Sequence, residues 1–293
     1  MATLRELKGR IGSVASSEKI TGAMKMISSA KMHKAEASLR RLLPFRNQVN
    51  DIIANLLSSD AEFASPLITP RRVQRVAIVV WGSDDGLCGA YNVNIYKQLL
   101  EKIKALRSEA GPKVGIDIIA VGRKIAKLTS TIADCRTIQI DGINSKSDGK
   151  PVDNMMSRLA DQFTSGEYDR VDALYMSFKS MGRQRLEFQQ LLPVLYSSFA
   201  QAAEGIPAGR PYLFEPGPNA IFNTVLPLFL MSTMQEIFIQ NRASEQAARV
   251  MAMQSANDNA KKLLDQLQLE YNKLRQQSIT NELLDIVGGQ SHD

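Results

Sequence analysis

Cysteine, histidine and aromatic residues are scarce in this chain, and each shortage excludes a class of protein. Of the 293 residues, two are cysteines and two are histidines. Two thiols cannot build the disulfide framework of a small secreted protein or a cysteine-only zinc site. We therefore expect Cys88 and Cys135 to be reduced thiols in a cytosolic compartment. Aromatic residues make up only 6% of the chain, a composition that suits long helices better than a thick globular core.

Long apolar runs are also missing, and so is proline near the C-terminus. No run of 18 apolar residues occurs, so the sequence predicts no membrane-spanning helix. The first residues lead at once into a charged periodic segment and do not resemble a signal or transit peptide. Because no proline follows Pro227, a helix from about residue 230 to 287 would be roughly 85 Å long at ~1.5 Å per residue. Such a helix must project into solvent or into a partner.

Positive charge is concentrated at one end of the chain. Residues 1–46 contain ten Lys or Arg and three Asp or Glu, which gives 10 − 3 = +7, whereas the whole chain carries +6. A basic helix can bind nucleic acid, a membrane surface or an acidic protein. A solvated helical face accounts for a charge run equally well. Phe45 is the only Phe, Tyr or Trp in this segment, so the residues that stack on bases are missing.

Residues 1–58 are predicted to form one long coiled-coil helix. Its first apolar positions are spaced 3, 4 and 3 apart: Leu4, Leu7, Ile11 and Val14. The stripe resumes in a shifted phase at Ile20, Met24 and Ile27. That shift predicts a discontinuity in the coiled-coil seam. Pro44 predicts a kink or a break in the helix.

Residues 212–289 are predicted to form the C-terminal coiled-coil helix, with a more regular heptad pattern over residues 250–274. The seam positions follow the spacing 3, 4, 3, 4, 3, 4, 3 without a slip: Val250, Met253, Asn257, Ala260, Leu264, Leu267, Tyr271 and Leu274. Such regularity favours a coiled-coil seam over the face of a globular helix. Asn257 lies within the seam, where a polar residue fixes register at a cost in stability.

The central residues, 74–200, have a different texture. Short apolar runs at 75–81, 113–121, 137–140 and 171–178 predict buried strands, and helical stretches at 91–108, 123–129 and 152–163 separate them. Alternating strands and helices indicate an α/β layer with a mostly parallel, Rossmann-like sheet. The segment Gly205–Pro218, rich in Pro and Gly, is predicted to be the loop that returns the chain to the coiled coil.

The segment 82–92, GSDDGLCGAYN, follows the first predicted strand. A glycine-rich loop between a strand and a helix is where nucleotide-binding folds hold phosphates. This loop fits neither G-x-G-x-x-G nor the P-loop and lacks the phosphate-binding lysine. Cys88 has no histidine in the central region to activate it, since the histidines are His33 and His292. A structural turn is the expected role, and the sequence predicts no catalytic residue, cofactor or metal site.

Three stretches of the chain resemble the gamma subunit of F-type ATP synthases. They are ITGAMKMISSAKM within residues 7–34, SDDGLCGAYN at 83–92, and a C-terminal set that comprises PYLFEPGPNAIF, ASEQAARVMAMQSANDNA and YNKLRQQSITNELLDIVGG. The order of the three stretches, with one at each end of the chain, makes the resemblance specific. Asp85 departs from the family, which usually has Arg there.

The resemblance implies a central rotor shaft without a catalytic site or cofactor. The terminal helices would pair antiparallel and enter a ring of alternating catalytic and noncatalytic ATPase subunits, and the α/β domain would lie near the membrane rotor ring. An epsilon-type subunit is a further implied partner, and nucleic acid is not. The implied location is the cytoplasmic side of a bacterial inner membrane, with the mitochondrial inner membrane as an alternative.

The resemblance also carries over individual residues that contact the catalytic subunits. Arg275 and Gln276 match the family's Arg-Gln pair, Thr280 and Glu282 match positions near it, and Met24 and Lys25 match the Ala-Met-Lys-Met stretch. Because Arg275 and Gln276 fall outside the heptad seam, we expect them to point away from the partner helix. Two alternatives remain from the residues alone: a nucleotide-binding α/β enzyme with helical arms, and a basic coiled-coil protein that binds nucleic acid.

Overall fold

The computed structural model describes residues 3–57, 61–144, 147, 149–195, 197, 199 and 214–289, with side chains as far as Leu284. The chain divides into two compact units. One unit, which we call the terminal unit, combines Met1–Ser29 with Arg249–Asp293; the other, the central unit, is Ala30–Ala248. The loop predicted at Gly205–Pro218 lies outside the described residues as far as residue 213.

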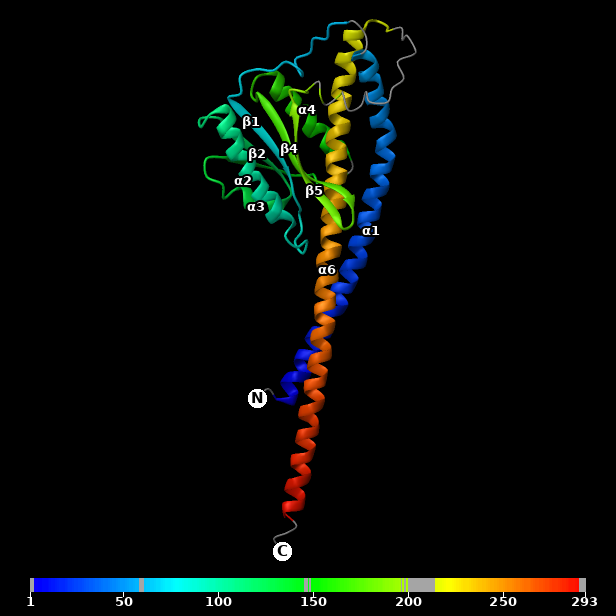
Figure 1. Ribbon diagram of the computed structural model, residues 1–293, viewed down its shortest axis with the longest axis vertical. Helices are drawn as coiled ribbons and strands as arrows, with labels where there is room; N and C mark the ends of the chain where they lie inside the picture. Colours follow the sequence, from blue (N-terminus) through cyan, green and yellow to red (C-terminus); the bar gives the residue numbers. More distant parts are fainter. Residues whose placement is uncertain are drawn as a thin grey trace. The chain divides into compact units, whose positions relative to one another are not determined.

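Two long helices contribute to both units (Figure 1). Helix α1 spans Leu4–Leu57 and helix α6 spans Pro218–Gly289. The side chain of Thr3 caps α1, since its Oγ1 accepts a hydrogen bond from the Glu6 N–H at 3.2 Å. The expected break at Pro44 does not occur, because α1 continues through it. Pro44 is exposed, so water can reach the carbonyl group that loses its helical donor there.

Helix α6 starts earlier than residue 230 and continues through Pro227. One 18-residue window of α6 is apolar enough to cross a membrane by length and composition alone. No such helix was predicted from the sequence, because the criterion was an unbroken run of apolar residues. The window in α6 also contains uncharged polar residues, which interrupt such a run. However, 56% of that window is buried within the structure. Phe222, Leu226 and Met234 are no more than 1% exposed in the hydrophobic core, which is the pattern of a core helix.

A five-stranded sheet forms the middle layer of the central unit. The strands are β1 (Arg75–Trp81), β2 (Gly115–Val121), β3 (Arg136–Ile140), β4 (Arg170–Ser180) and β5 (Arg183–Leu192). Their order is β3-β2-β1-β4-β5; the first four are mutually parallel, and β5 is antiparallel to β4. The Rossmann-like α/β fold class expected from the sequence is thus confirmed. Strand β5 was not predicted, because RQRLEFQQLL carries mostly polar residues.

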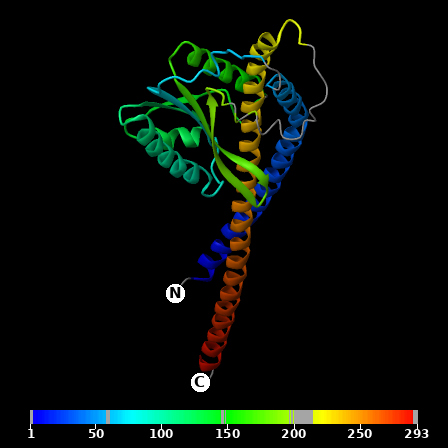
Figure 2. The same ribbon diagram turned by 45° about the horizontal axis from the view of Figure 1, so that its top comes forward.

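Helices cover both faces of this sheet (Figure 2). Helices α2 (Tyr91–Ala110) and α3 (Arg123–Thr129) pack on the face that carries Val76, Ile78 and Val80. Helix α4 (Lys150–Thr164) and the first half of α6 pack on the opposite face, with Ala77 and Val79. Both faces are buried, as expected for strands that read as continuous apolar runs.

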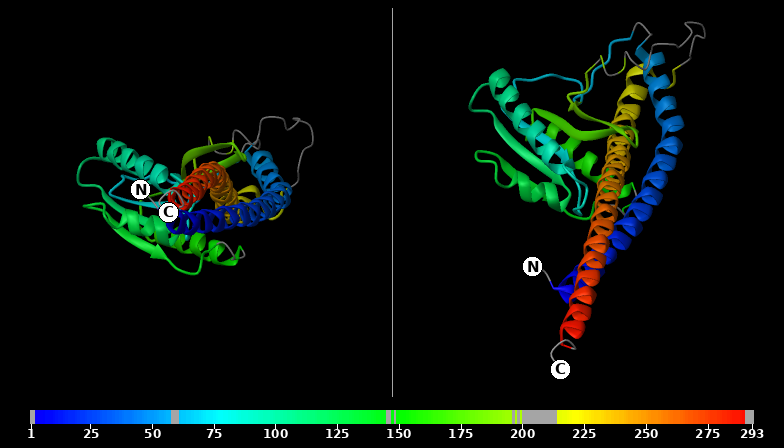
Figure 3. Two further views of the ribbon diagram at one scale, coloured as in Figure 1. Left: turned by 90° about the horizontal axis from the view of Figure 1, so that it is seen from below. Right: turned by 60° about the horizontal axis from the view of Figure 1, so that its bottom comes forward.

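Within the central unit, the buried side-chain amide of Asn241 connects α6 to the sheet and to α2 through hydrogen bonds. Tyr91 donates its hydroxyl hydrogen to Asn241 Oδ1 at 2.7 Å, and Asn241 Nδ2 donates to the Gly82 carbonyl at 3.2 Å. Ser244 Oγ donates to the Met176 carbonyl at 2.9 Å. The Ser244 bond joins α6 to β4, and the β4–β5 ribbon accordingly lies beside α6 (Figure 3).

Candidate partner interface on the terminal helices

The terminal unit is an antiparallel pair of helical segments, and the seam predicted on α6 is confirmed. Val250, Met253, Asn257 and Leu267 are buried. The remaining predicted seam positions are partly buried: Ala260, Leu264, Tyr271 and Leu274. From residue 259 to residue 277, all the positions outside the seam are exposed. A single narrow stripe of α6 therefore contacts α1, as in a two-stranded coiled coil.

The seam of α1 differs from the prediction. Partly buried and buried positions continue the first spacing without a shift: Leu4, Leu7, Ile11, Val14, Glu18, Thr21, Lys25 and Ser28. The predicted shifted stripe is wrong, since Ile20 is 59% and Ile27 56% exposed. From residue 18 to 28 the seam positions are polar, whereas Ile20 and Ile27 face outward. Met26, which is 69% exposed, belongs to the same outward surface.

Asn257 explains how polar residues can occupy this part of the seam. Its Nδ2 donates to the Glu18 carbonyl at 2.7 Å and lies 3.3 Å from Thr21 Oγ1. Lys261 Nζ lies 4.0 Å from a Glu18 carboxylate oxygen. A side chain on Gly22 would come within 3.4 Å of the Asn257 amide nitrogen. Hydrogen bonding and close approach thus replace apolar packing here, and they fix the register of the two helices.

The two helices end at different levels. Asn257 pairs with Glu18 and Thr21, and in an antiparallel pair the partners of later α6 residues lie earlier in α1. Helix α1 begins at Leu4, so α6 runs past the end of α1 shortly after Leu274, as Figure 1 shows. Ile279, Leu283 and Leu284 are 49–63% exposed on this single-helix end.

The candidate contact residues form two groups that the structure keeps apart. Arg275, Gln276, Thr280 and Glu282 are all exposed on the single-helix end. Within the helix, Thr280 Oγ1 donates to the Gln276 carbonyl at 2.9 Å, and Ser278 Oγ donates to Glu282 Oε1 at 3.3 Å. No ion pair involves Arg275 in the described part of the chain.

Met24 and Lys25, the second group, are both partly buried; Lys25 occupies a seam position and Met24 lies next to it. They lie on the far side of the Thr21–Asn257 pair, and Arg275 is 18 residues beyond Asn257. At ~1.5 Å per residue, the two groups are separated by more than about 25 Å. Any partner that contacts both must therefore span at least this distance along the terminal unit.

The outward surface formed by Ile20, Met26 and Ile27 was not predicted from the sequence. The available signal was the seven-residue spacing of Ile20 and Ile27, which was interpreted as part of the seam. Exposed apolar side chains are candidate contacts for a partner. These three residues lie next to Met24 and Lys25 in sequence and extend that group.

The glycine-rich loop of the central unit is held by its own hydrogen bonds. Ser83 N–H donates to Asn92 Oδ1 at 3.0 Å, and Asn92 Nδ2 returns a bond to Ser83 Oγ at 2.7 Å. Gly82 is required because a Cβ atom there would lie 2.4 Å from Ile125 Cβ. The glycine makes room for helix α3, whereas in a nucleotide-binding loop it makes room for a phosphate. Asp85, the departure from the gamma pattern, lies 3.5 Å from Arg123.

Comparison with known proteins assigns the chain to a family. The family model for ATP synthase matches residues 3–291. The chain is 39% identical to the ATP synthase gamma chain of Bacteroides thetaiotaomicron and 40% identical to that of Phocaeicola vulgatus, over 99% of this chain and 99% of each relative. Its fold matches a chain in the mitochondrial ATP synthase of Euglena gracilis, with a TM-score of 0.64 and 22% identity, over 98% of this chain and 93% of that one.

The chain therefore belongs to the family of ATP synthase gamma chains. Its function is that of a gamma chain of an ATP synthase.

Proposed function

We propose that the chain is a non-catalytic shaft whose terminal unit contacts catalytic subunits and whose rotation changes their conformation. The exposed single-helix end of α6 carries the proposal. An isolated helix of fewer than about 12–15 residues is marginal in water, and this end also exposes Ile279, Leu283 and Leu284. A surrounding protein ring would stabilise the helix and cover these side chains.

The coupling follows from thermodynamic linkage. A shaft whose sides differ makes different contacts with each catalytic subunit at every rotor angle. A partner that binds two conformations unequally shifts their populations by the difference in its binding free energies. The terminal unit has this asymmetry, since α1 exposes the apolar Ile20 and Ile27, whereas the single-helix end of α6 exposes the polar Arg275 and Gln276.

The partners and location are proposed from the relatives. The Euglena structure comprises OSCP, F1 and a c-ring. By analogy, the proposed partners of this chain are a ring of alternating catalytic and noncatalytic subunits, a membrane rotor ring and an epsilon-type subunit. Its place is then peripheral, on the cytoplasmic face of a bacterial inner membrane. Copurification in stoichiometric complex with a hexameric ATPase tests this, and recovery of the chain without such a ring would contradict it.

We assign the ring contacts to Arg275, Gln276, Thr280, Glu282, Met24 and Lys25. An exposed guanidinium can form two parallel charge-assisted bonds with a carboxylate, each worth about 1.5–3 kcal/mol when shielded from water. Such a contact would be made at one rotor angle and broken at the next. In the free chain Arg275 is exposed, so its removal should leave the fold intact.

Arg275→Ala therefore separates the proposed contact from a structural role. Helix content and melting temperature of the free chain should stay within experimental error of the parent, whereas ATP turnover and proton coupling of the assembled enzyme should fall. Lys273→Ala is the matched control, because it removes an exposed positive charge two residues earlier. Normal turnover and coupling in Arg275→Ala, or equal losses in both variants, would remove Arg275 from the interface.

A further inference from the structure

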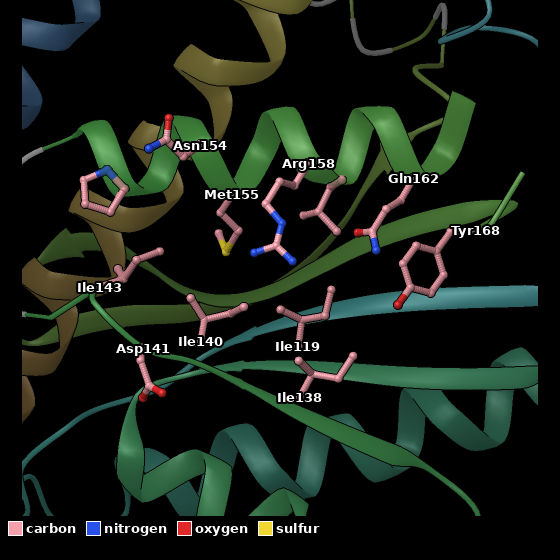
Figure 4. Close-up of a pocket in the computed structure, with 12 residues that line it drawn as sticks. Ile119, Ile138, Ile140, Asp141, Ile143, Asn154, Met155, Arg158, Gln162 and Tyr168 are labelled. Atoms are coloured by element: carbon pink, nitrogen blue, oxygen red, sulfur yellow. The ribbon is translucent and has the colours of Figure 1, made fainter. Parts of the chain in front are cut away.

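A cavity of about 270 Å³ lies in the central unit between α4 and the β2–β3 end of the sheet (Figure 4). It exists because β3 is an edge strand, and α4 packs closest to β4, on the other side of β1. The isoleucines of β3 are consequently only half covered. None of the residues that line this cavity is among the proposed ring contacts.

The cavity has an apolar floor. Ile119 of β2 and Ile138 and Ile140 of β3 form the floor, and Met155 and Leu159 of α4 face it. The hydroxyl group of Tyr168, at one end, already donates to Asp117 Oδ2 at 3.0 Å. Tyr168 therefore presents mainly its ring. The lining can accommodate an aliphatic or aromatic body several carbons long.

One side of the cavity is cationic. Arg158 extends from α4 toward the strands, with Gln162 beside it one turn further along the helix (Figure 4). Within the described residues Arg158 has no ion-pair partner. Asp141 also lines the cavity, but it lies beyond Ile140 from Arg158 and accepts a bond from Gln139 Nε2 at 2.8 Å. The guanidinium group thus remains available to a ligand.

We propose that this cavity binds a small amphipathic anion, whose carboxylate, or an equivalent acidic group, pairs with Arg158 and Gln162 and whose apolar body lies on the three isoleucines. A carboxylate accepts two parallel bonds from a guanidinium group. The remaining ligand surface gains from burial against isoleucine and methionine side chains. Ligand pockets commonly combine such an apolar lining with a few polar anchoring groups.

Octanoate is a suitable probe, with octanol as its uncharged counterpart. The full-length chain would carry [¹³C-methyl]methionine, and the Met155 resonance would be assigned by Met155→Leu. We expect a saturable shift of this resonance with octanoate. Octanol should bind at least tenfold more weakly, because it lacks the charge that pairs with Arg158.

Two variants on the same helix make the test specific. Arg158→Gln should weaken octanoate binding at least tenfold. Lys150→Gln, which removes an exposed charge outside the cavity lining, should leave binding within twofold. The absence of a saturable Met155 shift, equal affinity for octanol and octanoate, or equal effects of the two variants would each overturn the proposal. Native methionine spectra of both variants without ligand establish that they are folded.

Discussion

Replacing Asn241 with alanine tests how α6 is fastened to the central sheet. The amide accepts the Tyr91 hydroxyl hydrogen at 2.7 Å and donates to the Gly82 carbonyl at 3.2 Å. Asn241 is 3% exposed, so water cannot replace these bonds. In Asn241→Ala the Tyr91 hydroxyl loses its 2.7 Å acceptor and retains the backbone carbonyl of residue 241, at 3.2 Å. The Gly82 carbonyl loses its side-chain donor, and the Met176 N–H loses its side-chain acceptor at 3.4 Å.

The expected loss of stability follows from these three groups. A buried polar group left without its partner costs about 1–3 kcal/mol, so the substitution should lower the unfolding free energy by roughly 3 kcal/mol. For a unit of this size, 1 kcal/mol corresponds to about 2–4 °C in melting temperature. We therefore expect a decrease of about 6–12 °C.

The only tryptophan provides the assay. Trp81 is 1% exposed at the end of β1, and its ring centroid lies 5.7 Å from that of Phe238 on α6. Urea and thermal unfolding monitored by Trp81 fluorescence therefore report the docking of α6 on the sheet. Asn259→Ala, an exposed position on the same helix, is the control. A loss below about 0.5 kcal/mol, or one equal to that of the control, would refute the reasoning.

A double-mutant cycle sharpens the result. Tyr91→Phe removes only the hydroxyl group that bonds to Asn241. If the two residues share one network, the losses of Asn241→Ala and Tyr91→Phe should add to more than the loss of the double variant. Strict additivity would show that Asn241 stabilises the helix through some other contact.

Three further predictions concern the loop, the core and the basic helix. Gly82→Ala should lower the unfolding free energy, measured by urea titration, by about 1–3 kcal/mol, because the added Cβ would lie 2.4 Å from Ile125 Cβ. Gly86→Ala is the control and should be nearly neutral in the same titration, because its Cβ would meet only Lys124 Cε, at 3.9 Å. Burial raises the pKa of Asp172 from an ordinary value of 3.8 to about 6, with Arg170 opposing the shift. The folded state therefore favours the protonated acid, and the resulting stability is complete below about pH 4 and lost as the pH rises through 6. Measured by unfolding at several pH values, Asp172→Asn should gain on the parent chain between pH 4 and 7, by at most about 3 kcal/mol; a difference that does not change with pH would contradict this. Arg40→Gln combined with Arg41→Gln should change assembly and coupling little, since the Arg40–Glu36 pair is exposed and such pairs contribute about 0–1 kcal/mol; loss of assembly would show that this segment is a specific contact.

The central sheet could be predicted where strands are buried on both faces. β1 was predicted at its observed bounds, since Val76 to Trp81 are all buried and a continuous apolar run needs no information about neighbours. β5 could not be predicted in this way. It lies at the edge of the sheet and is mostly half-buried, so its polar composition resembles that of a loop. Only the pairing with β4 identifies it as a strand.

The start of α6 illustrates a second limit. Pro227 suggested a helix start near residue 230, yet the helix begins at Pro218. Phe222 and Leu226 are fully buried there, and that burial compensates for the backbone bond that proline removes. Packing against other segments outweighed the low helix propensity of proline here. The sequence of one segment gives no information about such packing. The cavity beside Arg158 was missed for the same reason, since its lining comes from β2, β3 and α4.

The terminal unit shows why apolar spacing alone gave the wrong seam between residues 18 and 28. The heptad rule places apolar residues toward the partner helix, because it assumes that this helix is the only partner. Here Glu18 and Thr21 face α6 and bond to Asn257, while Ile20 and Ile27 remain more than half exposed. Exposed apolar area of this kind costs about 25 cal/mol per Å² until it is covered. The polar seam fixes the pair of helices without using these residues, which leaves them for the second partner that the proposed ring supplies.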